Sequence, residues 1–349
     1  MKFARMLKPL LCSFAIALYS LSAAVHAQEL KQTKKLEKVS FSMSSTSMLN
    51  LPIYVADVMG YFKNHGIEPN LVQFHKGGAT ALAAVISGNV NLYIGSTGSA
   101  IRAVQSGTDA VIIGTVMSEI SLNIVMSAKA AQQRNIVSST PVKQRIAALK
   151  GLKIGITGAG GATHQVIQYA LTSVGLDPTR DATLAFVGSG ADMLGAMSSG
   201  NVDAIVGANP TSDMAILQHQ GVLLVNGTTG EYPGLKGMAQ LVAVTTHRWA
   251  NTNPELARRT MTSIQDGQRT IRNPEVTNKA RDLVHKKYFS GIDKDVFNSA
   301  WKNVIPAFPE SPKFSLEQVT RNIDFLNAFS EDKYEVDPAR VYSEKYLPQ

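Results

Sequence analysis

An 18-residue segment occurs twice in this chain, at a constant offset of 112 residues. GATALAAVISGNVNLYIG occupies residues 78–95, and GADMLGAMSSGNVDAIVG occupies residues 190–207. The two copies are identical at nine of their 18 positions, which is far more than chance allows. A period above 100 residues is too long for a solenoid repeat, so the segment indicates two similar halves.

Each copy predicts a helix followed by a buried strand. A glycine opens each helix, and each helix ends at Ser-Gly, where Gly88 and Gly200 can adopt the left-handed backbone of a helix end. Asn-Val then begins a short apolar strand. Because a helix leading into a buried strand is one step of an α/β sheet, we expect two α/β halves, each with a mostly parallel sheet flanked by helices.

Alternating strand and helix patterns divide the chain into three parts. We expect residues 28–118 to begin the first half, residues 119–238 to form the second, and residues 239–349 to return to the first half and end in helices. LPIYVADVMGYFKNHG (51–66) predicts one helix, and Asn273-Pro274-Glu275 predicts the start of another. The polar stretch 128–150 predicts a surface excursion with one short helix near residues 141–149.

The first 27 residues predict a secretory signal peptide. They combine a basic start, an apolar run from Pro9 to Ala24 and small residues before a cut after Ala27. The alternative is an uncleaved anchor, but about 16 apolar residues fall short of the ~20 that span a bilayer. Cys12, the only cysteine, lies in this segment, and the residues before it do not fit a lipidation site. We therefore expect a periplasmic, soluble protein without thiols.

The charge of the mature chain is modest. Removing three basic residues with the signal peptide leaves 34 − 3 = 31 basic and 26 acidic residues, a net charge of +5. Together with export, this small excess argues against nucleic acid as a partner. A weak positive field still favours an anionic ligand.

Six loops follow predicted strands and open predicted helices: SSTSMLN, KGGAT, GSTGS, GAGGATH, GSGAD and GANPTS. Ligands of open α/β sheets bind at the carboxyl ends of the strands, where helix N-termini present N–H groups to anions. The candidate ligand-binding residues are Ser45, Thr46, Gly78, Thr80, Ser96, Thr97, Ser99, Glu119, Thr163, His164, Asn209 and Tyr232. The alternative for each hydroxyl is to cap its own helix, and the alternative for His164 is a surface or capping role. Glu119 and Tyr232 lie near the crossovers, where a solvated hinge role is the alternative.

Catalytic, metal and nucleotide motifs are absent from the sequence. GAGGATH has Thr163 where a dinucleotide-binding loop has its third glycine, and no Walker pattern occurs. The six mature histidines lack metal-ligand spacing, and there is neither a G-x-S-x-G elbow nor a mature cysteine. We expect no catalytic residue, metal or cofactor.

Five stretches together resemble the substrate-binding proteins of ABC importers, in the group that takes nitrate, sulfonates, taurine and thiamine-pyrimidine precursors. They are LPIYVADVMGYFKNHGIEPNLVQF, GGATALAAVISGNVNLYIG, LKGLKIGIT with its GAGGAT loop, SGADMLGAMSSGNVDAIVG and VDPARVYSEKYLP. The resemblance implies a two-lobed periplasmic-binding-protein-like fold with two crossover strands. It further implies a monomer that closes over one small ligand and reaches the membrane only through an ABC permease and its ATPase. The loop positions that usually meet ligand in this group are Ser45, Thr46, Gly78, Thr80, Ser96, Thr97, Thr163 and Asn209.

The ligand class is the least constrained feature. Lys76 and Arg102 are the basic residues nearest the predicted loops, so backbone N–H groups and hydroxyls are expected to capture an anion such as a sulfonate. Aromatic acids and pyrimidines stay open. Replacing Thr80 or Thr163 with alanine is expected to weaken binding by roughly 1 kcal/mol. The other functions considered are an enzyme of the thiamine-pyrimidine synthase type, which the absence of mature cysteines disfavours, and an anchored ligand-sensing ectodomain.

Overall fold

The computed structural model of the protein describes residues 35–43, 46–74, 77–232 and 234–349. Residues Glu37–Gln349 form one compact unit. The predicted signal peptide, Ser45 and Lys76 lie outside the described residues. None of the helices in the described ranges has the length and hydrophobicity that a membrane-spanning helix requires.

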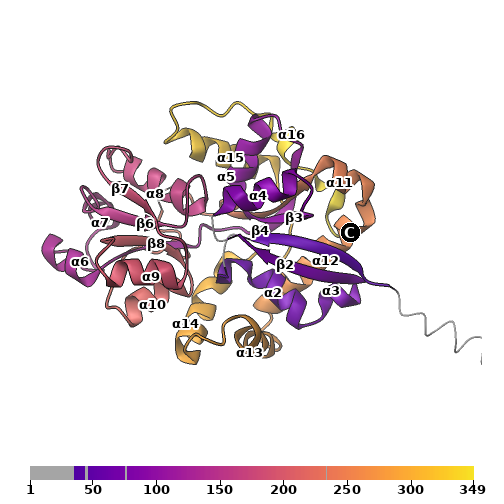
Figure 1. The fold of residues 1–349 in the computed structure, drawn as a ribbon, viewed down its shortest axis with the longest axis horizontal. Helices are drawn as coiled ribbons and strands as arrows, with labels where there is room; N and C mark the ends of the chain where they lie inside the picture. Colours follow the sequence, from indigo (N-terminus) through magenta and orange to yellow (C-terminus); the bar gives the residue numbers. More distant parts are fainter. Residues whose placement is uncertain (1–34, 44–45, 75–76, 233) are drawn as a thin grey trace, which may run out of the picture. The chain divides into compact units, whose positions relative to one another are not determined.

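The described residues form two five-stranded sheets with the same strand arrangement (Figure 1). In spatial order, the first sheet contains β2 (Ile67–Gln73), β1 (Glu37–Met43), β3 (Leu92–Ser96), β10 (Leu241–Thr246) and β4 (Ala110–Met117). The second contains β7 (Thr183–Phe186), β6 (Lys153–Ile156), β8 (Ala204–Ala208), β5 (Leu122–Met126) and β9 (Val222–Val225). The fourth strand of each, β10 or β5, is antiparallel to both of its neighbours. The predicted mostly parallel sheets are confirmed.

Two segments carry the chain between the sheets. The first leads from β4 into β5, and the second leads from β9 into β10. They lie side by side, because Gln240 N donates to Met117 O at 3.1 Å and Ser121 N donates to Gln240 Oε1 at 2.6 Å. The predicted pair of crossovers is confirmed.

The sequence repeat forms the same unit in each half. In the first half α4 (Gly78–Ile86) leads into β3, and in the second α9 (Ala191–Ser198) leads into β8. Gly88 has a φ of +79° and Gly200 has a φ of +74°, which is the left-handed backbone predicted for both helix ends.

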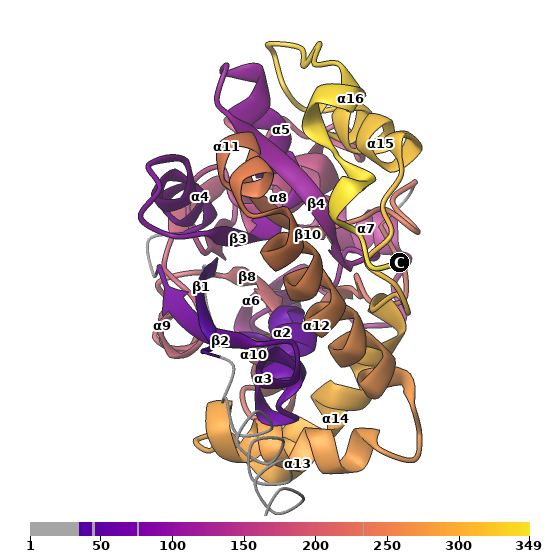
Figure 2. The same cartoon turned by 90° about the vertical axis from the view of Figure 1, so that its right-hand side faces the viewer.

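Helices cover both sheets. The helices that alternate in sequence with the strands of the first sheet are η1 (Met48–Asn50), α2 (Leu51–Val58), α3 (Tyr61–Asn64), α4 and α5 (Thr97–Gln105). Those that alternate with the strands of the second sheet are α6 (Ala128–Arg134), α7 (Val142–Ala147), α8 (Ala162–Thr172), α9 and α10 (Thr211–Leu217). The C-terminal part contains α11 (His247–Thr252), α12 (Pro254–Arg272), α13 (Thr277–Tyr288), α14 (Lys294–Val304), η2 (Ile305–Ala307), α15 (Leu316–Asn327), α16 (Pro338–Val341) and η3 (Glu344–Tyr346). Helix α12 packs against α2 and β4 of the first half (Figure 2).

Three helix predictions were wrong in detail. The single helix over residues 51–66 is divided into α2 and α3 by Gly60, whose φ of +78° interrupts the helical backbone. The helix expected at Asn273 begins instead at Thr277, because the Asn273 side chain accepts from Glu275 N at 2.9 Å and forms a turn. The stretch 128–150 contains two helices, and α6 is capped by Ser127.

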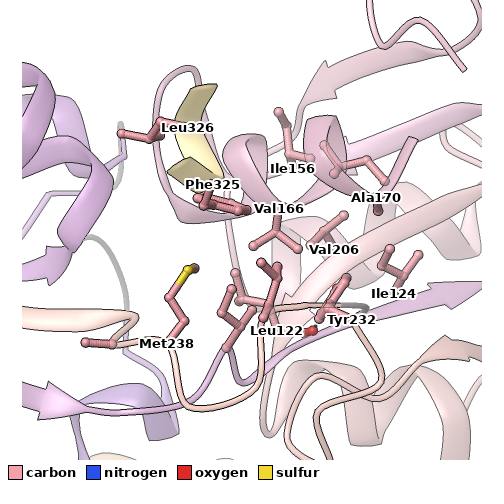
Figure 3. Packing of buried hydrophobic residues seen from close by; sticks show 14 of the residues in the cluster. Leu122, Ile124, Ile156, Val166, Ala170, Val206, Tyr232, Met238, Phe325 and Leu326 are labelled. Atoms are coloured by element: carbon pink, nitrogen blue, oxygen red, sulfur yellow. Dashed lines mark hydrogen bonds between the residues drawn. The ribbon is translucent and has the colours of Figure 1, made fainter. Parts of the chain in front are cut away.

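Buried apolar residues form three clusters in the described part of the chain, and one of them joins the two halves. This shared cluster contains Tyr93 and Ile101 from the first half, Val166 from α8 of the second, and Phe325 from α15. Figure 3 shows part of it, with Phe325 beside Val166. The other two clusters stay within one half each.

Candidate ligand-binding site

A cavity of about 60 Å³ lies between the two halves and receives residues from all six predicted loops. The loops contribute Thr46 and Ser47, Gly78, Ser96, Gly161 to Thr163, Ser189 and Gly190, and Ala208 and Thr211, in chain order. Gly78 and Gly190, which begin the two copies of the repeat, therefore line one cavity from opposite halves.

The cavity wall is polar and apolar but carries no formal charge among the described residues that line it. Its hydroxyl side chains are Thr46, Ser47, Ser96, Thr157, Thr163, Ser189 and Thr211. Its larger apolar side chains are Leu49, Ile94, Leu122, Met193 and Leu241. Burial raises the pKa of the Tyr93 phenol, which also lines the cavity, so this group is neutral at physiological pH.

Glycine backbones bring two helix N-termini together across the cleft. A β-carbon added to Gly77 would lie 3.7 Å from the Gly158 α-carbon, and one added to Gly161 would lie 3.8 Å from Gly78 N. Gly77 and Gly161 are the N-cap residues of α4 and α8, and the first N–H groups of these helices have no partner within the helix. The cavity thus has hydrogen-bond donors and a partial positive potential without a cationic side chain.

Thr163 positions the loop that follows β6. Its Oγ1 accepts from Thr157 N at 3.1 Å and lies 2.8 Å from Thr157 Oγ1, and both residues line the cavity. Thr157 was not among the predicted site residues. Its position directly after the apolar strand KIGI is the sequence signal that could have identified it.

Ser47 presents an unpaired hydroxyl to the cavity. Its side chain is buried, and its Oγ has no hydrogen-bond partner within the described structure. A buried polar atom without a partner costs stability, and a ligand that bonds it removes that cost. Sequence reasoning named Ser45 and Thr46 in the same loop but missed Ser47.

Four predicted residues lie near the cavity but do not line it. Thr80 is exposed on the first turn of α4. Thr97 Oγ1 donates to Ala239 O at 2.7 Å, and Ser99 Oγ donates to Gly160 O at 3.3 Å. Asn209 is buried between two lining residues, where its Nδ2 donates to Asp213 Oδ2 at 2.7 Å.

The remaining three predicted residues brace backbone near the cleft. His164 Nδ1 accepts from Gly160 N at 2.9 Å, and burial, followed by the Arg102 charge, lowers the pKa of this histidine. Glu119 Oε2 accepts from Gly237 N at 2.8 Å. The buried Tyr232 hydroxyl donates to Leu122 O at 2.9 Å. All three fix loops or crossovers in this structure.

The structure offers no metal centre within its described residues. No group of three or more His, Cys, Asp or Glu side chains that could hold an ion occurs there. Arg102, the other basic residue considered, donates from Nε to the Tyr334 hydroxyl at 3.1 Å and does not line the cavity.

The NMT1-like family matches residues 37–285, which is more than half of the chain. The chain belongs to the NMT1-like family. YtlA of Bacillus subtilis (strain 168) is 22% identical to this NMT1-like protein over 272 residues, which cover 77% of this chain and 76% of YtlA. The family resemblance predicted from the sequence is confirmed.

Two solved structures show that this NMT1-like protein has the periplasmic-binding-protein-like fold. A protein from Bordetella bronchiseptica RB50 superposes with a TM-score of 0.77 at 22% identity, covering 88% of this chain and 95% of its own. The alkanesulfonate-binding protein SsuA from Xanthomonas axonopodis pv. citri, bound to MOPS, gives a TM-score of 0.69 at 16% identity, covering 88% and 99%. The predicted two-lobed fold is confirmed.

Proposed function

We propose that this NMT1-like protein is the extracytoplasmic solute-binding component of an ABC importer, and that it closes over a small organic anion of the sulfonate type. The observation that carries the proposal is the cavity between the halves, to which all six loops contribute. The shared fold with an alkanesulfonate-binding protein supports it. The protein then works as a periplasmic monomer that delivers its ligand to a permease and the associated ATPase.

The hydrogen-bond donors at the cavity support the anionic class of the ligand. The N-termini of α4 and α8 and the hydroxyls of Ser47 and Thr163 can surround an oxyanion without a cationic side chain. A sulfonate suits such a site, because its charge is spread over three oxygens that each accept hydrogen bonds.

The organic part of the ligand follows from the apolar wall. Leu49 and Met193 line the cavity from different halves, together with Leu122 and Leu241. An inorganic anion would leave these side chains against water, whereas an alkyl group buries them. We therefore favour a short organic sulfonate over an inorganic anion.

Transport rather than turnover fits the same lining. General acid–base catalysis needs a titratable group within hydrogen-bond reach of the reacting atoms. Apart from the neutral Tyr93 phenol, the described lining residues carry no His, Asp, Glu, Lys or Cys side chain. The hydroxyl and apolar groups that line the cavity suit reversible capture and release of an unaltered ligand.

Closure couples capture to delivery. A ligand that contacts both halves only in the closed arrangement shifts the population toward it by its differential affinity. The crossovers around Ser121 and Gln240 are the segments that must bend in such a motion.

Thermal unfolding with a ligand panel tests the proposal. The panel compares organic sulfonates, inorganic anions, aromatic acids and neutral pyrimidines at equal concentration. A ligand at ~100 times its dissociation constant adds ~2.7 kcal/mol to the free energy of unfolding. We expect a short sulfonate to raise the melting temperature most and to be recovered unchanged by mass spectrometry. A shift by a neutral pyrimidine alone would overturn the anionic class, and recovery of a converted product would overturn the transport role.

A further inference from the structure

The two halves meet along two seams of opposite character, which lie on either side of the crossovers (Figure 1). In the first seam, α5, α8 and α15 share the continuous apolar cluster. In the second, α10 of the second half contacts α14, whose buried side chains belong to the core of the first half. We call this helix contact, together with the adjoining loop contact between Met48 and Asn209, the polar seam; its residues are Met48, Asn209, Asp213 and Asn303.

Asp213 is the centre of the polar seam. Its Oδ2 accepts from Asn209 Nδ2 at 2.7 Å within the second half, and its Oδ1 accepts from Asn303 Nδ2 of α14 at 3.2 Å. Asn209 also bonds across the seam, because its carbonyl oxygen accepts from Met48 N at 2.9 Å. Two hydrogen bonds therefore connect the halves here, and one of them ends on a carboxylate.

The polar seam borders the ligand cavity on both sides. Ser47 and Leu49 flank Met48 and line the cavity, and so do Ala208 and Thr211, before and after Asn209. Separating Met48 from Asn209 would pull these two walls apart. The hydrogen bonds of the seam thus complete the cavity without contacting the ligand themselves.

The seams differ in how water would affect their separation. Opening the apolar seam exposes hydrophobic side chains to water, which is unfavourable in proportion to the exposed area. Opening the polar seam instead hydrates Asp213, which is 6% exposed. Burial raises the pKa of this carboxyl, although Asn209 and Asn303 both donate to it, so its charge is incompletely compensated in this arrangement. Asn303 is already exposed and can exchange its bond for water.

We propose that Asp213 and Asn303 form a polar latch that stabilises the closed arrangement and separates when the halves open, while the apolar seam remains packed. The proposal rests on the closing motion of the proposed function but not on the chemical identity of the ligand. Asp213 and Asn303 are positioning residues, since they act on the cavity through the η1 loop and the Asn209 loop. Because water can replace the hydrogen bonds of the latch, the open and closed arrangements differ little in free energy, and a small ligand can shift the equilibrium between them.

Asn303→Asp is the variant that tests the latch. It is nearly isosteric, lies at an exposed position, and places a second carboxylate against Asp213 in a seam where the groups facing Asp213 are Asn209, Ser212 and Asn303. Repulsion between the two carboxylates should favour the open arrangement at pH 7. Lys302→Gln is the matched control, because it changes the net charge equally on the same exposed part of α14.

The readout is the distance between spin labels at two exposed positions, Gln218→Cys at the end of α10 and Lys286→Cys on α13, with the native Cys12 replaced by serine. Without added ligand, we expect Asn303→Asp to lose the short-distance population at pH 7, and lowering the pH to 5 to restore part of it by protonating one carboxyl. Lys302→Gln should match the wild type. The sulfonate with the largest thermal shift should bind Asn303→Asp about tenfold more weakly or worse, because the competent population falls.

An Asn303→Asp distance distribution identical to that of the wild type at pH 7 would overturn the latch. So would an identical change in Lys302→Gln, since that would reflect net charge rather than the seam. The proposed function fails separately: if a bound sulfonate leaves the label distances of the wild type unchanged, the closing motion itself is wrong. If no sulfonate binds, the ligand class is wrong, but the distances without ligand still decide the latch.

Discussion

The ring of Tyr93 occupies the space that a β-carbon of Gly95 would need. A β-carbon built on Gly95 would lie 1.8 Å from Tyr93 Cζ, and one built on Gly78 would lie 2.5 Å from the Tyr93 hydroxyl oxygen. The ring is buried, and its hydroxyl accepts from Ser96 N at 3.2 Å. The repeated segment therefore needs glycine at both positions, because any β-carbon there would overlap the Tyr93 side chain at the cavity.

Gly95→Ala should destabilise the protein by about 1–3 kcal/mol or more, because the buried ring must move to admit the methyl group. Gly207 is the matched control, since it is the equivalent residue of the second repeat. A β-carbon there meets Met193 Sδ at 3.5 Å, which is an ordinary contact. Urea unfolding should show a lower free energy of unfolding for Gly95→Ala and a nearly unchanged value for Gly207→Ala. Equal losses in the two variants would contradict the packing described.

Ser47→Ala and Thr163→Ala should both weaken sulfonate binding, for different reasons. Ser47→Ala removes an unpaired hydroxyl from the cavity, so binding should weaken by about 1 kcal/mol while the stability of the ligand-free protein stays level or rises. Thr163→Ala removes the acceptor of Thr157 N and should lower both affinity and stability. Titration calorimetry and urea unfolding measure the two effects.

Thr80→Ala is the control for these variants, because Thr80 is exposed and does not line the cavity. Its affinity should equal that of the wild type, in contrast to the expectation from the sequence alone. Weaker binding in Thr80→Ala with full binding in Ser47→Ala would place the ligand outside the cavity.

The protein should lose stability below about pH 6.5 through His164. Burial and then Arg102 lower the pKa of this imidazole, so the unfolded chain binds its proton more readily than the folded one. The contribution of His164 to the free energy of unfolding is therefore fully present above its unfolded pKa of about 6.5. This contribution declines as the pH falls through about 6.5 toward the lower pKa of the folded state. Melting temperatures should decrease from pH 7 to pH 5.

His164→Asn isolates this contribution, since the asparagine oxygen can replace Nδ1 as the acceptor of Gly160 N. The decrease between pH 7 and pH 5 should be smaller in His164→Asn than in the wild type. Asp213 is present in both proteins, so its opposite contribution cancels in the comparison. Parallel pH profiles would mean that His164 is not the responsible group.

Repetition and hydrophobic alternation determine the fold well enough to be read from the sequence. The duplicated segment predicted the α4–β3 and α9–β8 units because the apolar pattern and the Gly88 and Gly200 helix ends are local features. The split at Gly60 was missed because a glycine within an otherwise helical pattern can be either tolerated or left-handed. Tertiary packing of α2 and α3 decides between these outcomes.

The candidate site was predicted at the level of loops rather than side chains. All six predicted loops reach the cavity, since helix N-termini after strands collect at one edge of a sheet. Which hydroxyl points inward depends on one or two backbone dihedrals, so Ser47 and Thr157 were missed. Thr97 and Ser99 instead bond to Ala239 O and Gly160 O, partners that lie far away in the sequence.

Small-angle X-ray scattering with and without ligand measures whether the two halves close when ligand binds. The sulfonate with the largest thermal shift is added to the full chain at ~100 times its dissociation constant, where binding is essentially complete. We expect the radius of gyration to fall on saturation, because the halves that share the cavity close over the ligand. An unchanged radius of gyration with calorimetrically confirmed binding would contradict it.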